Sequence, residues 1–335
     1  MKCTFCKVIN YEYWHPFVWH VLGLPVHIYN SLKCRSFFYF TALNPNFGKT
    51  GGFIGDSKKE IQDFLPETYS LKDSVLENFA DFEKEINCLE LNYPVVLKPI
   101  SGERGEGVKV IHSLKEAETY FKEQPKKYKK LLQEFSTYKE EFGIFVYNHP
   151  HRGWQISGVN IKKPFVVKGD GESTVLSLIN QKCRYRQQLD RIISEGVIDL
   201  QRVPKVGEIV LLEKVLNHRF GTEFINCTNL INDKFRSVII GICSQVPGFD
   251  YGRFDIKANS FEDIQQHNFK VIELNGAAAE PTIIYDQQNT GFFKSWSIII
   301  RHLYIQGQIA KRNIGLGHKP ASYKVIRQAF KSHFS

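Results

Sequence analysis

The sequence predicts an α+β protein built from two lobes. Its 335 residues, of which 42% are hydrophobic, are enough to bury at least one large core, and two lobes are the expected division at this length. Strand-like apolar runs and helical segments are grouped rather than strictly alternating, which favours α+β lobes over one doubly wound sheet. The 24% of charged and 13% of aromatic residues exclude a disordered, collagen-like or low-complexity chain.

Short apolar runs between turn residues mark the expected strands, and capped segments with helical periodicity mark the expected helices. We expect strands at residues 36–43, 93–98, 108–112, 131–135, 143–146, 165–168, 208–213, 252–258 and 268–275. We expect helices at residues 57–64, 113–122, 173–185, 232–245, 290–310 and 322–333. The chain is therefore expected to end in two helices.

The positive charge is concentrated near the C-terminus. The chain has 44 Lys and Arg against 35 Asp and Glu, a net charge of +9, which favours acidic partners such as nucleotides or an anionic surface. Residues 301–335 hold seven of the basic side chains and no acidic one, which leaves 37 against 35 in the rest. A solvated helix explains this tail about as well as an anion or membrane contact does. The net charge therefore says little about an active site.

Cysteine usage and hydropathy indicate a cytoplasmic protein. The seven cysteines are an odd number and form no disulfide framework for this length, and we expect no secretory leader. Cys3 and Cys6 make one CxxC pair, but a zinc site needs a second pair or histidines at ligand spacing. No apolar run is long enough to span a bilayer. A membrane contact is not expected; the aromatic N-terminus and the basic tail are the segments that would make one.

Two short motifs on neighbouring strands bring oxygen ligands and a guanidinium together. Arg253 and Asp255 are two residues apart on one expected strand, and Glu273 and Asn275 are two apart on the next, so each pair shares a face. If the strands pair antiparallel, all four side chains lie on one surface. Carboxylate and amide oxygens suit Mg²⁺, which binds one or two carboxylates together with substrate phosphates. The alternative is the solvent-facing charged side of an edge hairpin.

Two further segments carry charged residues in a suggestive order. In PVVLKPISGERGEGV, Lys98 ends a buried strand and a glycine-rich loop follows, whose backbone N–H groups can approach phosphate oxygens. In LQEFSTYKEEFG, Glu134 and Glu141 are seven residues apart across a short connection. Taken singly, a hairpin turn explains the first segment and a solvated charged loop explains the second.

Taken in order, these segments resemble the ATP-grasp superfamily, most closely its D-alanine–D-alanine ligase-like and amino-acid ligase branch. The resemblance covers residues 57–290: a strand with Lys98 and a glycine-rich loop, then Glu134 with Glu141 seven residues on, then Arg-x-Asp, then Glu-x-Asn. Four ordered motifs are far more specific than any one of them. The resemblance implies the ATP-grasp fold, in which two α+β lobes grip ATP, preceded here by a short atypical N-terminal region.

The resemblance also implies which residues would bind ATP. Lys98 would hold the α- and β-phosphates. Gln133, Glu134 and Phe135 would form the adenine hinge, with Glu134 contacting the exocyclic amine through its backbone and side chain, and Glu141 would bind the ribose hydroxyls. The flap over the phosphates would contain Ser101, Gly102, Gly105 and Gly107.

For the chemistry, the resemblance implies that Asp255, Glu273 and Asn275 bind two Mg²⁺ ions that bridge the phosphates. Arg253 would stabilise the transferred phosphate or the tetrahedral intermediate. Arg253, Lys98 and Asn275 are therefore the expected catalytic residues.

A turn at residues 169–174 (GDGEST) resembles a segment of the cyanophycin-synthetase-like branch, and Lys168 precedes it. By the same resemblance, Asn217 or Arg219 would lie near the phosphates, and Lys214 would be a further phosphate contact. After Glu-x-Asn, however, the sequence GAAAEPT stands where D-alanine ligases have a Pro-Gly-Met-Thr type of turn that holds the second substrate. D-alanine is therefore unsupported as a substrate.

Four regions are expected along the chain. Residues 1–75 form an aromatic-rich region before the ATP-grasp part, and residues 76–145 form an N-lobe with the flap. Residues 146–300 form a C-lobe with the Mg²⁺ and phosphate site, and residues 301–335 form the basic helical tail. A homodimer is compatible with this organisation.

The expected activity is that of an ADP-forming carboxylate–amine ligase. It would make an acyl phosphate from ATP and a small carboxylate, and an amide with an amino-acid-like amine. The alternative enzyme is an ATP-grasp kinase acting on a polyol or phosphorylated acceptor. It would need an acceptor pocket rich in Lys and Arg, which Lys162, Lys163, Arg184, Arg186 and Arg191 could supply. Two non-enzymatic alternatives are a nucleotide-binding scaffold, disfavoured by the intact Mg²⁺ motifs, and a nucleic-acid binder, for which no recognition motif is present.

Overall fold

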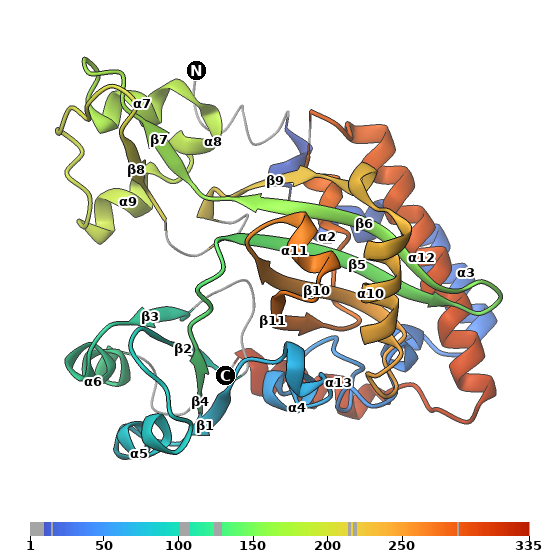
Figure 1. Ribbon diagram of the computed structural model, residues 1–335. Helices are drawn as coiled ribbons and strands as arrows, with labels where there is room; N and C mark the ends of the chain where they lie inside the picture. Colours follow the sequence, from blue (N-terminus) through green and yellow to red (C-terminus); the bar gives the residue numbers. More distant parts are fainter. Residues whose placement is uncertain are drawn as a thin grey trace.

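Three antiparallel sheets form the framework of this chain in the computed structural model (Figure 1). The structure describes residues 10–14, 16–100, 107–123, 129–213, 216, 220–286 and 288–334. Helices pack on the sheets in separate groups rather than as connections between parallel strands, so the predicted α+β class is confirmed.

A four-stranded sheet has the order β1-β4-β2-β3. Its strands are β1 (Asp73–Leu76), β2 (Val95–Pro99), β3 (Lys109–Ile111) and β4 (Lys130–Glu134). Helices α5 (Ala80–Cys88) and α6 (Leu114–Glu123) cover one face, where Leu97 and Leu132 are fully buried. Because side chains alternate along a strand, Lys98 points to the opposite face, away from these helices.

A five-stranded sheet with the order β11-β10-β5-β6-β9 forms the centre of the molecule. Its strands are β5 (Glu140–His149), β6 (Gly153–Lys163), β9 (Glu223–Asn226), β10 (Tyr251–Ala258) and β11 (Phe269–Asn275). Helices α10 (Asp233–Cys243) and α11 (Phe261–Gln265) pack on one face. Helix α10 begins where the Asn232 side chain accepts a hydrogen bond from the N–H of Phe235, and its apolar stripe then lies on the sheet.

The opposite face of the five-stranded sheet is covered in a different way. Helices α12 (Phe292–Gly315) and α3 (Leu24–Cys34), with the 3₁₀ helix η2 (Tyr39–Ala42), pack on Phe145, Tyr147 and Tyr251 at one end. The Tyr251 hydroxyl lies 3.1 Å from His302 Nδ1 of α12. Two and four residues beyond Tyr251 on the same face are Arg253 and Asp255. The uncovered end of this face therefore carries polar side chains.

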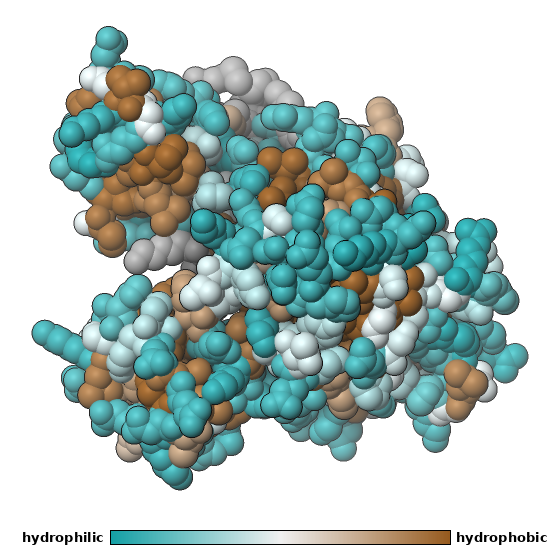
Figure 2. All heavy atoms as spheres, viewed as in Figure 1, coloured by the Kyte–Doolittle hydropathy of each residue, from teal (hydrophilic) through white to brown (hydrophobic). Residues whose placement is uncertain are grey.

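A smaller unit projects from the end of β6 (Figure 1). It contains the two-stranded sheet of β7 (Val166–Lys168) and β8 (Ile209–Leu211), with helices α7 (Val175–Gln181), α8 (Cys183–Arg186) and α9 (Leu189–Glu195) around a core of its own. Figure 2 shows this unit and the four-stranded sheet projecting on the same side of the molecule, with a notch between them. Apolar residues gather on the unit beside this notch.

Short elements connect and cover these units. They are η1 (Tyr11–Tyr13), α2 (Pro16–Leu22), α4 (Lys58–Gln62), η3 (Glu67–Tyr69), η5 (Thr228–Leu230), η6 (Thr282–Tyr285) and α13 (Tyr323–Phe334). No helix among the described residues has the length and apolar character that crossing a membrane requires.

Two expectations from the sequence need correction. The expected strand at residues 36–43 is the 3₁₀ helix η2, because Thr41 and Leu43 donate backbone hydrogen bonds to Phe38 and Phe40 instead of to a partner strand. Burial of Tyr39 and Leu43 against α12 overrides the strand preference of this aromatic run. The second correction concerns the cysteines: Cys183 is disulfide-bonded, although no disulfide was expected, whereas Cys34, Cys88, Cys227 and Cys243 are free.

Candidate active site

The Arg-x-Asp and Glu-x-Asn motifs lie side by side on β10 and β11. These strands pair antiparallel, with Arg253 opposite Asn275 and Asp255 opposite Glu273. All four side chains therefore share one face of the sheet, as the spacing predicted. On the other side of β10, Asp255 lies opposite Gly143 of β5. A Cβ atom at Gly143 would lie only 2.7 Å from Asn160 Oδ1, so glycine leaves the room that these polar side chains occupy.

Arg253 binds Asp255 through two parallel hydrogen bonds. Its Nε and Nη2 donate to the two carboxylate oxygens at 2.8 and 3.0 Å, and Asn275 Nδ2 donates to Asp255 Oδ2 at 3.3 Å. Burial of the Asp255 carboxyl favours its neutral form, but the charges of Arg253 and Lys162 prevail and hold its pKa below the usual value. Asp255 is therefore a buried, ionised carboxylate.

Lys162 of β6 joins this cluster from the neighbouring strand. Its Nζ lies 2.5 Å from Glu141 Oε1 and 3.5 Å from Asp255 Oδ2, because Glu141 and Lys162 are opposite each other in the β5–β6 pairing. Although burial favours the neutral amine, Asp255 and Glu141 raise the pKa of Lys162 above its usual value. Glu141, expected to bind the ribose, thus lies on the face of the cluster and is ion-paired.

The two larger sheets make contact at a bulge in β11. Asp255 pairs with Glu273 but Ile256 pairs with Val271, so Ile272 is an extra residue on β11. The carbonyl oxygen of Ile272 accepts a hydrogen bond from Lys98 Nζ at 3.4 Å, and the same ammonium donates to Gln133 Oε1 at 2.9 Å. Burial is the main reason that the pKa of Lys98 falls to about 8, partly offset by the charge of Glu273. Lys98 therefore reaches from the four-stranded sheet to the edge of the Asp255 cluster.

Lys58 is a further cation of the site that the sequence reasoning missed. It is the first residue of α4, which Ser57 caps, and its Nζ lies 2.8 Å from Glu273 Oε1. Burial alone would raise the pKa of Glu273, but Lys58 and Lys98 hold it well below its usual range. The only sequence signal for Lys58 was its place at an expected helix start.

The expected hinge residues lie at the end of β4 on different faces. Gln133 contacts Lys98, so the side chain of the next residue, Glu134, points to the other face. Glu134 Oε2 accepts a hydrogen bond from the backbone N–H of Lys72 at 3.2 Å. Glu134 and Phe135 line a pocket of about 260 Å³ beside Lys72. The Glu134 side chain therefore points away from Lys98, whereas the Gln133 side chain contacts it.

Gly107 and Lys168 are the other expected site residues that the structure describes. Gly107 has a φ of +73°, and its carbonyl accepts a hydrogen bond from the Tyr120 hydroxyl of α6 at 2.7 Å, which holds one end of the expected flap. Lys168 is exposed at the end of β7 in the small unit. Ser101, Gly102, Gly105, Lys214, Asn217 and Arg219 lie outside the described residues.

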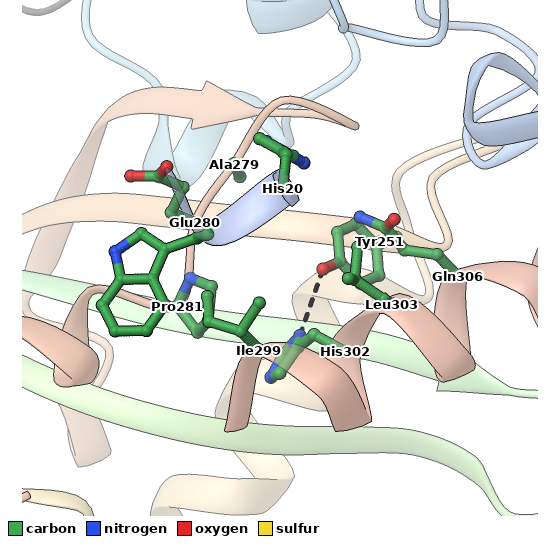
Figure 3. Close-up of a pocket in the computed structure, with 10 residues that line it drawn as sticks. His20, Tyr251, Ala279, Glu280, Pro281, Ile299, His302, Leu303 and Gln306 are labelled. Atoms are coloured by element: carbon green, nitrogen blue, oxygen red, sulfur yellow. Dashed lines mark hydrogen bonds between the residues drawn. The ribbon is translucent and has the colours of Figure 1, made fainter. Parts of the chain in front are cut away.

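A small pocket lies behind Arg253, next to the segment that follows Glu-x-Asn. Arg253 Nη1 donates to the carbonyl of Glu280 at 3.4 Å, and the Glu280 carboxylate accepts from the Tyr285 hydroxyl at 2.6 Å. Figure 3 shows Glu280 and His20 on one side of this pocket and the Tyr251–His302 hydrogen bond on the other. Its volume of about 40 Å³ suits water rather than a substrate.

The chain is similar to several known proteins. No protein-family model matches the sequence. Similar solved structures include the VanG D-Ala:D-Ser ligase of Enterococcus faecalis, at 12% identity and a TM-score of 0.42 over 76% of this chain and 62% of that chain. The ATP-grasp ligase PsnB matches at 14% identity and a TM-score of 0.41 over 75% of this chain and 60% of that chain.

A curated relative matches in sequence. It is the glutathione biosynthesis bifunctional protein GshAB of Clostridium perfringens, 25% identical over 219 residues, or 59% of this chain. The predicted resemblance to the ATP-grasp superfamily is confirmed. This chain spans only 27% of the length of that relative, so the activity of the whole relative does not transfer directly.

The ATP-grasp resemblance implies Mg²⁺, and the donors present fit it. Asp255 and Glu273 offer two ionised carboxylates from directly opposed positions, and Asn275 adds an amide oxygen. Mg²⁺ is commonly held by one or two carboxylates with water and substrate phosphates completing its shell. Among the described residues no group of three or more His, Cys, Asp or Glu side chains forms a closed metal site. The donor set therefore suits a cation that arrives with a nucleotide.

Proposed function

We propose that this chain is an ATP-dependent, ADP-forming carboxylate–amine ligase. The observation that carries the proposal is that Lys98 and Lys58 reach the neighbouring residues Ile272 and Glu273 of β11, beside the Arg253–Asp255 pair. A polyphosphate with bound metal ions requires both: cations that attract the phosphates, and hard oxygen donors that bind the metal. The described residues bring these groups together where the four-stranded and five-stranded sheets meet.

In the first step, a carboxylate oxygen of the donor substrate attacks the γ-phosphorus of ATP. The bond from that phosphorus to the β,γ-bridging oxygen breaks, ADP leaves, and an acyl phosphate forms. Lys98 and Lys58 would stabilise the charge on the phosphates, and Arg253 the charge on the transferred group. Asp255, Glu273 and Asn275 would hold two Mg²⁺ ions, which neutralise phosphate charge when bound.

In the second step, the lone pair of an amine attacks the acyl carbon. The bond from this carbon to the phosphate oxygen breaks, inorganic phosphate leaves, and the nitrogen loses a proton to give an amide. Arg253 would stabilise the oxyanion of the tetrahedral intermediate. An acyl phosphate hydrolyses in water, so closure of the expected flap at residues 101–107 would exclude solvent.

The alternative, an ATP-grasp kinase, has less support. Its acceptor pocket would need free cations, but Lys162 binds Glu141, Arg184 binds Glu12, and Arg191 binds Glu213. These partners already neutralise the charges that would attract a phosphorylated acceptor. The ligase therefore remains the better supported function.

The test measures ADP and phosphate release from ATP with pools of small carboxylates and amino acids, with hydroxylamine as a trap. A ligase gives carboxylate-dependent hydroxamate, because hydroxylamine captures the acyl phosphate; a kinase releases ADP but gives no hydroxamate. Asp255→Asn and Glu273→Gln should each abolish turnover. Glu140→Gln, next to Glu141 but half-exposed and paired with Lys163, is the matched control and should retain it. Unchanged turnover in Asp255→Asn would refute the proposed site.

A further inference from the structure

Helix α3 has its polar side inward and its apolar side toward solvent. Asn30 is buried and donates hydrogen bonds to the carbonyl of Leu303 at 2.7 Å and to the Tyr39 hydroxyl at 3.2 Å. Leu24, Ile28 and Leu32, spaced by four residues, form the outward face and are 51%, 52% and 75% exposed. A surface helix normally shows the reverse pattern, with its apolar stripe on the core. The outward face of α3 therefore needs an apolar cover.

Neighbouring elements extend this face. Val21 and Leu22 of α2 are exposed, as is Phe37 just after α3. Tyr29 of α3 stacks on Tyr304 of α12 with ring centroids 6.3 Å apart, and both rings are about half-exposed. We define the α2–α3 surface by these residues: Val21, Leu22, Leu24, Ile28, Tyr29, Leu32, Phe37 and Tyr304. Contiguous exposed apolar surface of this kind marks an interaction site.

The chain segments that form and border this surface contain no acidic residue. Residues 13–55 include three Lys and Arg and no Asp or Glu, and residues 287–335 include eight and none. The rest of the chain has 33 basic against 35 acidic residues, so these two segments carry the whole positive excess. They supply α13 and the three helices α2, α3 and α12, of which α3 contacts both α2 and α12. The charged side chains of the segments that form this surface are thus all basic.

Basic groups border the α2–α3 surface directly. Lys33 Nζ lies 5.6 Å from the ring centroid of Tyr29 and 5.9 Å from that of Tyr304. Lys311 is exposed on α12 two helical turns beyond Tyr304, so the two side chains lie on the same face of that helix. Amphipathic aromatic rings beside lysines are typical of residues at a membrane–water boundary.

The apolar α2–α3 surface could be covered by a second copy of this chain or by a lipid membrane, and the basic residues around it favour one of the two. A second copy of this chain related by a two-fold axis would bring the same basic surroundings together, with no carboxylate in either segment to compensate. An anionic bilayer offers an apolar interior for Leu24, Ile28 and Leu32 and negative headgroups for Lys33 and Lys311. We infer that the α2–α3 surface docks onto an anionic lipid membrane, with α3 lying in the plane of the interface. This inference stands independently of the catalytic proposal.

Vesicle flotation tests the inference. The whole chain should float with vesicles of phosphatidylcholine containing about one third phosphatidylglycerol, and its partition into phosphatidylcholine alone should be at least roughly tenfold lower. Ile28→Ser with Leu32→Ser, and Lys33→Glu with Lys311→Glu, should each lower partition by at least roughly tenfold. All four positions are at the surface, so circular dichroism should show an unchanged fold.

Matched controls replace residues of similar exposure elsewhere. Val197→Ser with Val206→Ser removes apolar side chains that are 84% and 81% exposed on the small unit, and Lys84→Glu with Lys115→Glu reverses charge on α5 and α6. Both controls should bind vesicles as the parent chain does. Equal partition into neutral vesicles, binding that the α2–α3 variants do not weaken, or a vesicle-independent dimer lost in those variants would overturn the inference. So would salt-sensitive binding to DNA without vesicle binding.

Discussion

The ammonium group of Lys58 lies 2.8 Å from the carboxylate of Glu273, so the first residue of α4 reaches the last strand of the five-stranded sheet. Lys98 bonds the carbonyl of the preceding residue, Ile272, and the charges of the two lysines hold the pKa of Glu273 far below the usual value despite burial. In the proposed ligase, an arriving metal ion would take over Glu273, and both lysines would turn to the phosphates. The proposal therefore gives Lys58 a phosphate-binding role that can be tested.

Replacing Lys58 by alanine should raise the KM for ATP by about tenfold or more, because one fixed positive charge beside the phosphates is lost. Lys58→Arg should recover most of the affinity, since the charge is retained. Steady-state kinetics with varied ATP gives the measurement. Lys122→Ala, an exposed lysine of α6 paired with Glu118, is the control and should leave KM unchanged. A KM that is the same in both alanine variants contradicts the role.

ATP affinity should fall as pH rises through the pKa of Lys98, which burial lowers to about 8. Below this pH the group is charged and attracts phosphates; above it the group is neutral. The stability of the folded chain changes with pH in the opposite direction. The unfolded chain keeps a lysine pKa of about 10.5, so between about pH 8 and 10.5 it binds more protons, and the free energy of unfolding rises with pH.

Titration calorimetry of ATP binding from about pH 7 to 9.5 checks this dependence. Lys98→Arg keeps its charge throughout the range, so its binding should lose the step near pH 8. A parent chain and a Lys98→Arg variant with parallel pH profiles would assign the step to another group.

The spacing of the motifs predicted part of the site, for a clear physical reason. A strand has a period of two, so Arg253 with Asp255 and Glu273 with Asn275 had to share faces once β10 and β11 paired. The bulge at Ile272 could not be predicted, because one extra residue in an apolar run leaves no distinct pattern. Its consequence, a carbonyl aimed at Lys98, is visible only in three dimensions.

Long-range partners were the other part that the sequence concealed. Lys58 meets a residue more than 200 positions away, and nothing local distinguishes it from Lys59. The sequence suggests Lys162 only for a basic acceptor pocket, yet the β5–β6 register places it against Glu141. In residues 36–43, aromatic strand formers became η2 because tertiary burial outweighed local preference.

Lys162 should act chiefly as the counter-ion of Glu141 and Asp255. Lys162→Met leaves two buried carboxylates short of a partner and should lower the free energy of unfolding by about 3 to 5 kcal/mol. The double variant Lys162→Met with Glu141→Gln should lose less than the single one, because the stranded charge is removed with its partner. Urea unfolding of the parent, both single variants and the double variant gives the coupling. Additive losses would show that Lys162 and Glu141 are independent.

Gly307 sets how closely α12 approaches α3. A Cβ atom there would lie 2.0 Å from Asn30 Oδ1, and Asn30 cannot move aside without breaking its hydrogen bonds to Leu303 and Tyr39. Gly307→Ala should therefore destabilise the chain by about 1 to 3 kcal/mol in urea unfolding. Gly241→Ala in α10 is the matched control, because no atom lies within 4 Å of its added Cβ. There the better helix propensity of alanine should stabilise by about 0.5 to 1 kcal/mol. Equal effects at the two positions would mean that helix propensity, rather than the contact with Asn30, governs Gly307.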